Sequence, residues 1–99
     1  MRVISSKTLR DFWQQPAFRD AEQPLRAWFE DAELADWKTP QDIKDVYKNA
    51  SIVADNRVVF NIKGNDYRLV VKIHYNTRTV YIRFIGTHKQ YDEIDVVNI

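Results

Sequence analysis

The sequence predicts a single domain of the α+β class, in which an N-terminal strand and two to three helices pack on one face of a small, mainly antiparallel β-sheet. Two periodicities predict this class. Apolar residues recur every three to four positions over residues 7–48 and every second position over residues 57–85. The length of 99 residues has room for one hydrophobic core, so residues 1–99 form one domain.

The N-terminal half predicts a strand followed by helices. Residues 1–5 are a short apolar run typical of a strand, and a first helix runs from Lys7 to Pro16, where proline ends or kinks it. A second helix is predicted over residues 20–36. A third begins at a capping sequence, Thr39-Pro40-Gln41-Asp42, and ends near Lys48. The residues expected to face the core are Leu9, Phe12, Trp13, Leu25, Trp28, Phe29, Ala32, Ile43, Val46 and Tyr47.

Three strands are predicted after residue 56, because β-branched and aromatic residues alternate with polar ones there. The runs are residues 57–63, 67–75 and 79–85. Short polar segments, 64–66 and 76–78, separate them and suit antiparallel hairpins.

Alternation along the strands divides their side chains between two faces of the sheet. One face is apolar in all three runs and includes Phe84. The opposite face gathers cations, and its most informative members are Arg57, Asn61, Lys63, Arg68, Lys72, His74, Tyr81, Arg83 and Ile85. An exposed polar face is the plainer interpretation, but five cations without a carboxylate would repel one another unless a polyanion binds. Tyr81 and His74 are suited to stack on bases, which favours single-stranded RNA as the ligand.

The overall charge of +1 conceals this division. Residues 11–45 carry a charge of −5, residues 57–89 carry +6, and the last ten residues carry −3. The absence of cysteine excludes disulfides, thiol nucleophiles and zinc ribbons. We expect a cytoplasmic protein, because no secretory signal and no apolar run of ~18 residues is present.

The segment after the third strand, residues 86–92, reads as a turn that starts with glycine. His88 in this segment is the side chain best suited to transfer protons near neutral pH. A metal site made of His74, His88 and Asp92 is the less favoured alternative, because two scattered histidines are a poor metal signal. We therefore expect no metal and no cofactor.

Two blocks of sequence resemble a known family. Gly64-Asn-Asp-Tyr-Arg-Leu69 and Gly86-Thr-His-Lys-Gln-Tyr-Asp92 are similar to the HigB toxins of bacterial type II toxin–antitoxin modules, within the RelE-like superfamily. The resemblance implies a RelE-like fold and a metal-independent endoribonuclease that cuts mRNA in the ribosomal A site. It also implies a HigA-type antitoxin with a helix-turn-helix fold as partner, with DNA contacted only through that antitoxin.

The resemblance also implies roles for individual residues. Arg68 falls on the phosphate-binding arginine of the superfamily, and His88 and Tyr91 fall on its late basic and aromatic positions. Many relatives have two lysines where this chain has Asn61 and Lys63, which makes a lysine base less certain. The predicted catalytic residues are Lys63, Arg68, Lys72, Arg83, His88 and Tyr91, and the predicted RNA-binding residues are Arg57, Asn61, His74, Tyr81 and Lys89.

Two other functions fit the same cationic face. A non-catalytic RNA- or ribosome-binding module would only grip phosphates, and an interaction domain would recognise an acidic protein segment. The acidic stretch over residues 20–45 has a plain interpretation as a solvated helix face, and two functional ones: it keeps phosphate away from the wrong side of the protein, or it docks the antitoxin.

Overall fold

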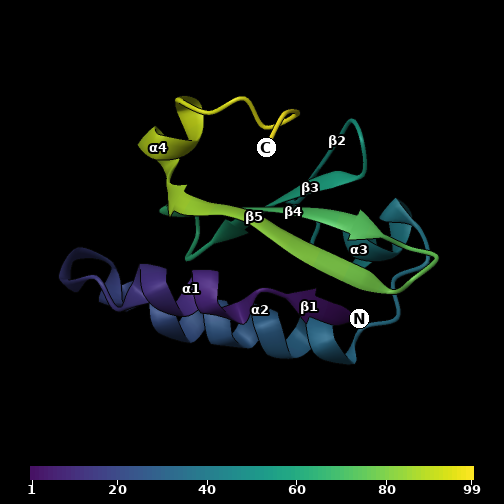
Figure 1. Cartoon of the computed structure of the whole chain (residues 1–99), viewed down its shortest axis with the longest axis horizontal. Helices are drawn as coiled ribbons and strands as arrows, with labels where there is room; N and C mark the ends of the chain where they lie inside the picture. The colour runs from purple at the N-terminus through teal and green to yellow at the C-terminus, as the bar shows by residue number, and fades with distance from the viewer.

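A five-stranded sheet with strand order β1-β5-β4-β3-β2 is the centre of the computed structural model, which describes residues 1–99 (Figure 1). β1 runs parallel to β5, and every other neighbouring pair is antiparallel. This confirms the predicted α+β class. The elements are β1 (Arg2–Ile4), α1 (Ser6–Trp13), the 3₁₀ helix η1 (Pro16–Ala21), α2 (Glu22–Leu34), α3 (Pro40–Val46), β2 (Ser51–Val53), β3 (Arg57–Ile62), β4 (Tyr67–His74), β5 (Thr79–Thr87) and α4 (His88–Asp92).

The helical layer covers the apolar face of the sheet, as the periodicity predicts. α1 and α2 lie together beneath the strands, whereas α4 and the C-terminal segment lie on the other side (Figure 1). Leu9, Leu25 and Trp28 are buried in one core cluster with Phe60 and Leu69 of the sheet. None of the helices has the length and apolar composition that crossing a membrane requires.

The cap of α3 forms as predicted, but the helix is shorter than predicted. The Thr39 hydroxyl accepts from the Asp42 amide, and the Asp42 carboxylate accepts from the Thr39 amide in return. The helix ends at Val46, and Tyr47 leaves helical geometry with φ −110° and ψ 82°. Val46 is 67% exposed, so its predicted inward orientation is wrong. Ile43 is the buried residue of α3 and the Tyr47 ring meets Phe60 edge to face, whereas Val46 is on the side of the helix that faces solvent.

A β-bulge in β5 reverses part of the predicted alternation. Val70 pairs with Phe84 while Val71 pairs with Ile82, so Arg83 is an extra residue opposite the β4 ladder. Ile85 therefore packs against the helix-side core, and Phe84 does not belong to it. The predicted faces of Phe84 and Ile85 are wrong, because strict alternation holds only where a strand has no extra residue.

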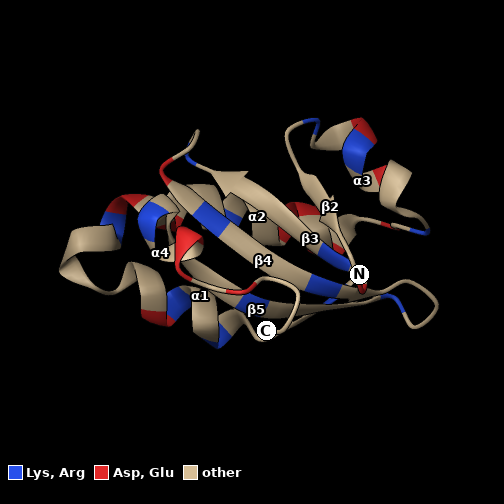
Figure 2. Ribbon diagram, turned by 90° about the horizontal axis from the view of Figure 1, so that it is seen from above, with Lys and Arg blue, Asp and Glu red and all other residues tan.

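The sheet face on which the cations were predicted is not an open surface. Val59 and Val70 lie on it, yet they are 3% and 0% exposed and stand outside the helix-side core cluster. α4 and the C-terminal segment cross above this face of the sheet (Figure 2). Ile94, Val96, Val97 and Ile99 of that segment are half-buried. The sheet is thus covered on both faces, with cations around a small second apolar cluster.

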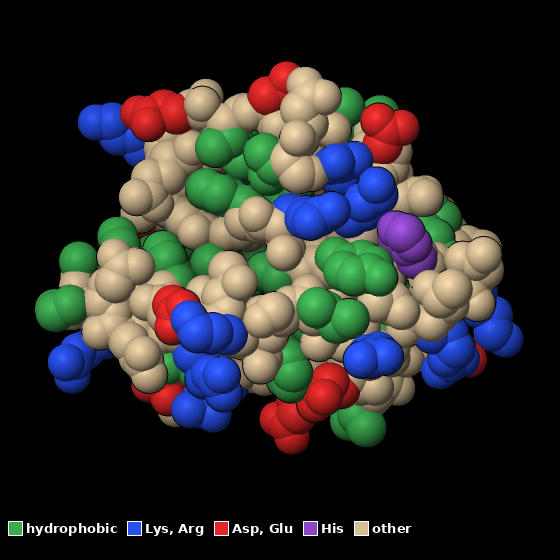
Figure 3. All heavy atoms as spheres, in the orientation of Figure 1, with side chains coloured by type: hydrophobic (Ala, Val, Ile, Leu, Met, Phe, Trp, Pro, Cys, Tyr) green, Lys and Arg blue, Asp and Glu red, His purple; other side chains and the backbone are tan.

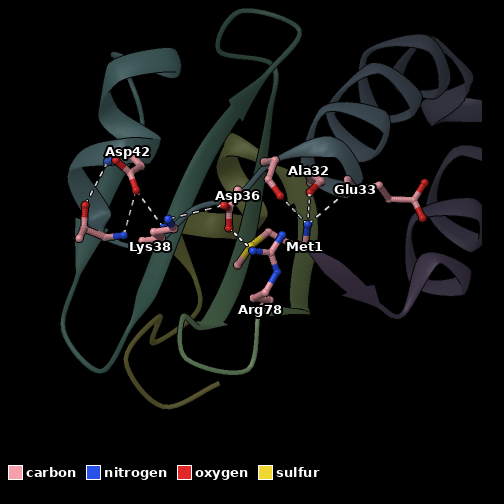
Figure 4. A network of polar contacts seen from close by, with 9 residues as sticks. Met1, Ala32, Glu33, Asp36, Lys38, Asp42 and Arg78 are labelled. Carbon is pink, nitrogen blue, oxygen red and sulfur yellow. Dashed lines mark hydrogen bonds and ion pairs between the residues drawn. The ribbon is translucent and has the colours of Figure 1, made fainter.

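Polar contacts join the N-terminus to the end of α2 (Figure 4). The Met1 ammonium donates to the carbonyls of Ala32, Glu33 and Ala35 at 3.0, 3.1 and 2.7 Å. A cation at this position complements the negative end of the helix dipole. Asp36 accepts from Arg78, which ties the end of the helical layer to the turn between β4 and β5.

Two leucines of α2 give a test of this layering. Leu25 is fully buried and Leu34 is 84% exposed on the same helix. We expect Leu25→Ala to lower the free energy of unfolding by about 2–5 kcal/mol, because it leaves a cavity. Leu34→Ala, the matched control, should change it by less than about 0.5 kcal/mol. Urea unfolding followed by circular dichroism measures both, and equal losses would contradict the assignment of the core.

Candidate nucleic-acid interface

The structure distributes the predicted RNA-facing residues over two clusters at opposite ends of β4. The ribbon of β4 is coloured for basic residues near both of its ends in Figure 2. One group, the α4 cluster, comprises Asn61, Arg68, His88, Lys89 and Tyr91. The other, the Tyr81 cluster, comprises Arg57, Lys72, His74, Tyr81 and Arg83. Arg68 and Lys72 are four residues apart on one strand, or ~13 Å along it, a span suited to an extended polyanion.

Strand pairing brings Arg68 next to the start of α4. Arg68 is directly opposite Gly86 on β5 and opposite Asn61 on β3. The His88 amide donates to the Asp66 carbonyl at 3.3 Å, so the first residue of α4 is held against the turn that precedes β4. The Arg68 guanidinium donates to the carbonyls of Asn65 and Tyr67 at 3.2 and 3.4 Å and forms no ion pair. Its remaining donors are therefore available to an anion.

The junction between β5 and α4 is closed by a reciprocal cap. The Thr87 hydroxyl accepts from the Gln90 amide at 3.1 Å, and the Gln90 side chain accepts from the Thr87 amide at 2.8 Å. A Cβ at Gly86 would lie 2.7 Å from Gln90 Oε1 and 2.5 Å from Phe84 Cζ. Glycine at position 86 thus lets the Phe84 ring and the Gln90 amide close over the junction that orients α4.

His88 has a carboxylate neighbour on its own helix. His88 Nδ1 lies 3.2 Å from Asp92 Oδ2, one helical turn later. The His88 side chain is 53% exposed, so the ring stays accessible to a ligand. A carboxylate at Nδ1 holds the imidazole in one orientation and leaves Nε2 to exchange protons. Lys89 is exposed beside it, and Tyr91 is half-buried.

The Tyr81 cluster combines cations with aromatic rings. The His74 and Tyr81 rings meet edge to face with centroids 5.1 Å apart, and the Arg83 guanidinium lies 6.0 Å from the Tyr81 ring centroid. Lys72 pairs with Tyr81 across the strands. Lys72 and Arg83 form no ion pair with any carboxylate. Figure 3 shows Lys and Arg side chains gathered beside a histidine and apolar side chains on the face that carries the C-terminal segment.

Arg57 is on the predicted face but under the C-terminal segment. It is 7% exposed, and its Nε and Nη2 donate to the main-chain oxygen of Ile99 at 3.0 and 2.5 Å. Nη1 donates to the Asp55 carbonyl at 3.2 Å. Its cross-strand neighbour is Lys72, so these main-chain oxygens offset the repulsion between two adjacent cations. In this structure the arginine fastens the covering segment.

Lys63 leaves the predicted face. β3 ends at Ile62, and Lys63 lies in the following turn with a left-handed φ of 52°. Its ammonium lies 2.6 Å from Asp20 Oδ2, on the helical side, and 3.6 Å from Asp66 Oδ2. The Asp20 hydrogen bond raises the pKa of Lys63. Lys63 is therefore held as an ammonium, which suits a point charge better than a general base.

Asp20 joins Lys63 to a tyrosine of β4. The Tyr67 hydroxyl donates to the second Asp20 oxygen. The hydrogen bonds from Lys63 and Tyr67 lower the pKa of Asp20. The pKa of Tyr67 is raised to about 12, mainly by burial and in addition by the hydrogen bond to Asp20. The three residues connect η1, the turn between β3 and β4, and the first residue of β4, which precedes Arg68 of the α4 cluster.

Three features of the site are absent from the sequence-based prediction. The segment over residues 86–92, read as a turn, forms a capped helix, and the Thr87-x-x-Gln90 pattern was a signal for it. Asp92 was weighed only as a metal ligand, although its spacing from His88 places both on one helix face. The covering of Arg57 has no sequence signal. No group of three or more metal-binding side chains occurs in the structure.

Comparison with known proteins decides the family. Residues 21–94, about three quarters of the chain, match the HigB toxin family, described as the RelE-like toxic component of a toxin–antitoxin system. The chain belongs to the HigB toxin family. It is 28% identical over 100 aligned positions to the mRNA interferase toxin HigB of Escherichia coli K12, an alignment that covers 99% of this chain and 94% of that protein. The mRNA interferase HigB proteins of Escherichia coli O157:H7 and Shigella flexneri give the same values.

Membership of the HigB family confirms the resemblance drawn from the two sequence blocks. Both blocks fall inside the matched residues 21–94. In the structure the first block forms the β3–β4 turn and the start of β4, and the second forms the end of β5 and α4. Register brings the two blocks side by side, because Tyr67 pairs with Thr87 and Arg68 pairs with Gly86. The part of this HigB-family chain that carries the resemblance is thus one continuous surface.

Acid titration tests the Asp20 contacts. A carboxyl whose folded pKa is lowered stabilises the fold above its ordinary pKa of 3.8, and this contribution is lost as the pH falls through the folded value. We expect Asp20→Asn to lower the melting temperature at pH 7. Below pH 3.8 the melting temperature of the variant should approach that of the parent protein. Asp11→Asn, which breaks an exposed pair with Lys7 on α1, is the control and should have a smaller effect. A pH-independent difference would contradict this account.

Proposed function

We propose that this chain is the toxin of a type II toxin–antitoxin module and cleaves mRNA on the ribosome. The observation that carries the proposal is the placement of an unpaired arginine, Arg68, beside the helix that holds His88. A cation that binds the phosphate and a side chain that transfers protons are two of the groups that phosphodiester cleavage uses. The relatives named as mRNA interferases support the same activity.

The proposed reaction is attack of a ribose 2′-OH on the adjacent phosphate. The 2′ oxygen forms a bond to phosphorus while the bond to the 5′ oxygen breaks, which leaves a 2′,3′-cyclic phosphate and a 5′-hydroxyl. A base takes the 2′ proton, and an acid gives a proton to the departing 5′ oxygen. His88 Nε2 is the proposed group for one of these transfers, and Tyr91 is a second proton carrier or a stacking surface. Asp92 acts as a positioning residue through His88 Nδ1.

Cations supply the second half of the mechanism. Arg68 offers a planar guanidinium to the phosphate oxygens, where negative charge develops. Lys63 contributes a nearby positive charge while it holds Asp20. Lys72 and Arg83 bind the strand further along the sheet, with Tyr81 and His74 as stacking surfaces. Asn61 and Lys89 complete the contacts near α4, and no step uses a metal ion.

The proposed partners follow from this activity. The message is cut in the ribosomal A site, so the toxin acts in the cytoplasm. A HigA-type antitoxin with a helix-turn-helix fold holds the toxin inactive, and the complex reaches DNA through that antitoxin. The alternative function is a non-catalytic RNA- or ribosome-binding module, which uses the same cations without His88 chemistry.

Single substitutions in the α4 cluster distinguish cleavage from binding. We expect His88→Ala to reduce cleavage about 10²- to 10⁴-fold with little loss of binding, because it removes a proton-transfer group. Arg68→Ala should reduce both. Primer extension on ribosome-bound mRNA detects the new 5′ ends, and kinase labelling without prior phosphatase identifies 5′-hydroxyls. Lys7→Ala, an exposed cation on α1, is the control. Binding without new 5′ ends by the parent protein would favour the non-catalytic module.

Two adjacent cations test which part of the sheet contacts RNA. Lys72 is unpaired, whereas Arg57 is covered by the C-terminal segment. The association constant for an oligoribonucleotide falls as the salt concentration rises. In a plot of its logarithm against log salt, Lys72→Gln should make the negative slope shallower by about 0.7, the value for one phosphate contact on a single strand. Arg57→Gln should leave the slope unchanged and lower the melting temperature. A reduced slope in Arg57→Gln would show that RNA displaces the C-terminal segment.

A further inference from the structure

The surface of α2 and α3 carries an apolar groove that the catalytic proposal does not use. Leu34 and Val46 are the two most exposed large hydrophobic residues of the chain, at 84% and 67%. Both line one groove of about 290 Å³, together with Asp31, Ala35, Trp37 and Tyr47. We call it the Leu34–Val46 groove. Leaving two aliphatic side chains in water beside an apolar floor is unfavourable in a monomer and typical of a binding surface.

The floor of the groove is fixed by the core. Trp37 is 5% exposed and lies against Phe60, with ring centroids 6.1 Å apart. Tyr47 meets both of these rings edge to face, at 6.4 and 5.0 Å. The Tyr47 hydroxyl donates to Asp31 at 2.9 Å, which joins α3 to α2 across the groove. A partner would therefore meet a preformed surface and would not have to order it.

The segment that supplies the groove, residues 30–47, is acidic, Asp31 lines the groove itself, and of the carboxylates in this segment only Asp36 forms ion pairs. We call these carboxylates the acidic rim. Residues 30–46 contain six acidic residues against two lysines. Lys38 lies 3.8 Å from Asp36, and Lys44 donates to the carbonyls of Lys48 and Ala50. Glu30, Asp31 and Asp45 are exposed and form no ion pair. Glu30 is one helical turn before Leu34, and Asp45 precedes Val46, so negative charge flanks both exposed aliphatic residues.

We infer that the Leu34–Val46 groove docks the antitoxin, through a segment that presents aliphatic side chains flanked by lysine or arginine. This inference rests on the proposed function, because it takes the partner to be an antitoxin. An amphipathic helix laid in a groove is the recognition mode that this chemistry fits. A second copy of the chain is disfavoured, because a twofold interface would place each acidic rim against its own copy. The groove is formed by α2 and α3, whereas the cations flank α4 and the C-terminal segment.

The experiment measures antitoxin affinity by calorimetry, with the antitoxin encoded beside the toxin gene as the probe. We expect Leu34→Ser combined with Val46→Ser to weaken binding about 100-fold or more, because two apolar side chains lose their burial. Ile52→Ser, which changes an exposed apolar residue of β2 outside the groove, should leave the affinity unchanged. Glu30→Lys combined with Asp45→Lys should slow association and weaken its salt dependence. Cleavage by the uncomplexed variants should equal that of the parent protein.

Each other result has a defined meaning. Unchanged affinity in the double serine variant overturns the inference, as does failure of the parent protein to bind the antitoxin. If sedimentation shows that the parent protein is a dimer and that the double serine variant is a monomer with the antitoxin affinity retained, the groove binds a second copy of the chain. That result also overturns the inference. A parent protein that binds the antitoxin through the groove but produces no new 5′ ends rejects the nuclease proposal and leaves the docking surface supported.

Discussion

The pairing of β4 with β5 is the contact on which the proposed site depends. It places Arg68 opposite Gly86 and so fixes where α4 starts relative to the cationic strand. The bulge at Arg83 turns Phe84 away from the helix-side core and Ile85 into it. Glycine at position 86 then leaves room for the ring of Phe84 and the cap of α4. A regular β5 without the extra residue would present a different set of side chains to α4.

Charge is separated between two surfaces of this small domain. The cations of β4 and β5 have no carboxylate partners, and of the carboxylates near the Leu34–Val46 groove only Asp36 forms ion pairs. Asp20 and Lys63 make one of the few ion pairs that connect the helical layer with the sheet. A chain organised in this way is nearly neutral overall while each surface keeps a field suited to its own partner. RNA and an antitoxin can then be recognised by different surfaces of one domain.

The covering of the second sheet face gives some basic residues a structural role. Arg57 has the charge and the strand position of an RNA-binding residue, but its guanidinium donates to main-chain oxygens of Ile99 and Asp55. Such an arginine stabilises the segment that buries Val59 and Val70. Lys63 is similar, because its ammonium is shared with Asp20. The residues that remain available to an anion are the cations that form no ion pair and are not covered, chiefly Arg68, Lys72 and Arg83.

The fold class, the helical faces of α1 and α2, the cap of α3 and the family could all be predicted from the amino-acid sequence, because they depend on periodicity and on local patterns. Periodicity has no means of showing a bulge, so the orientations of Phe84 and Ile85 were decided by the register of β5 against β4. Local pattern also cannot show which distant segment covers a residue. The burial of Arg57 by a segment 42 positions away, and the exposure of Val46, follow from how the finished elements fill space. For the same reason the sequence does not show which cations form ion pairs, because their partners are distant in the chain and are brought close by the fold.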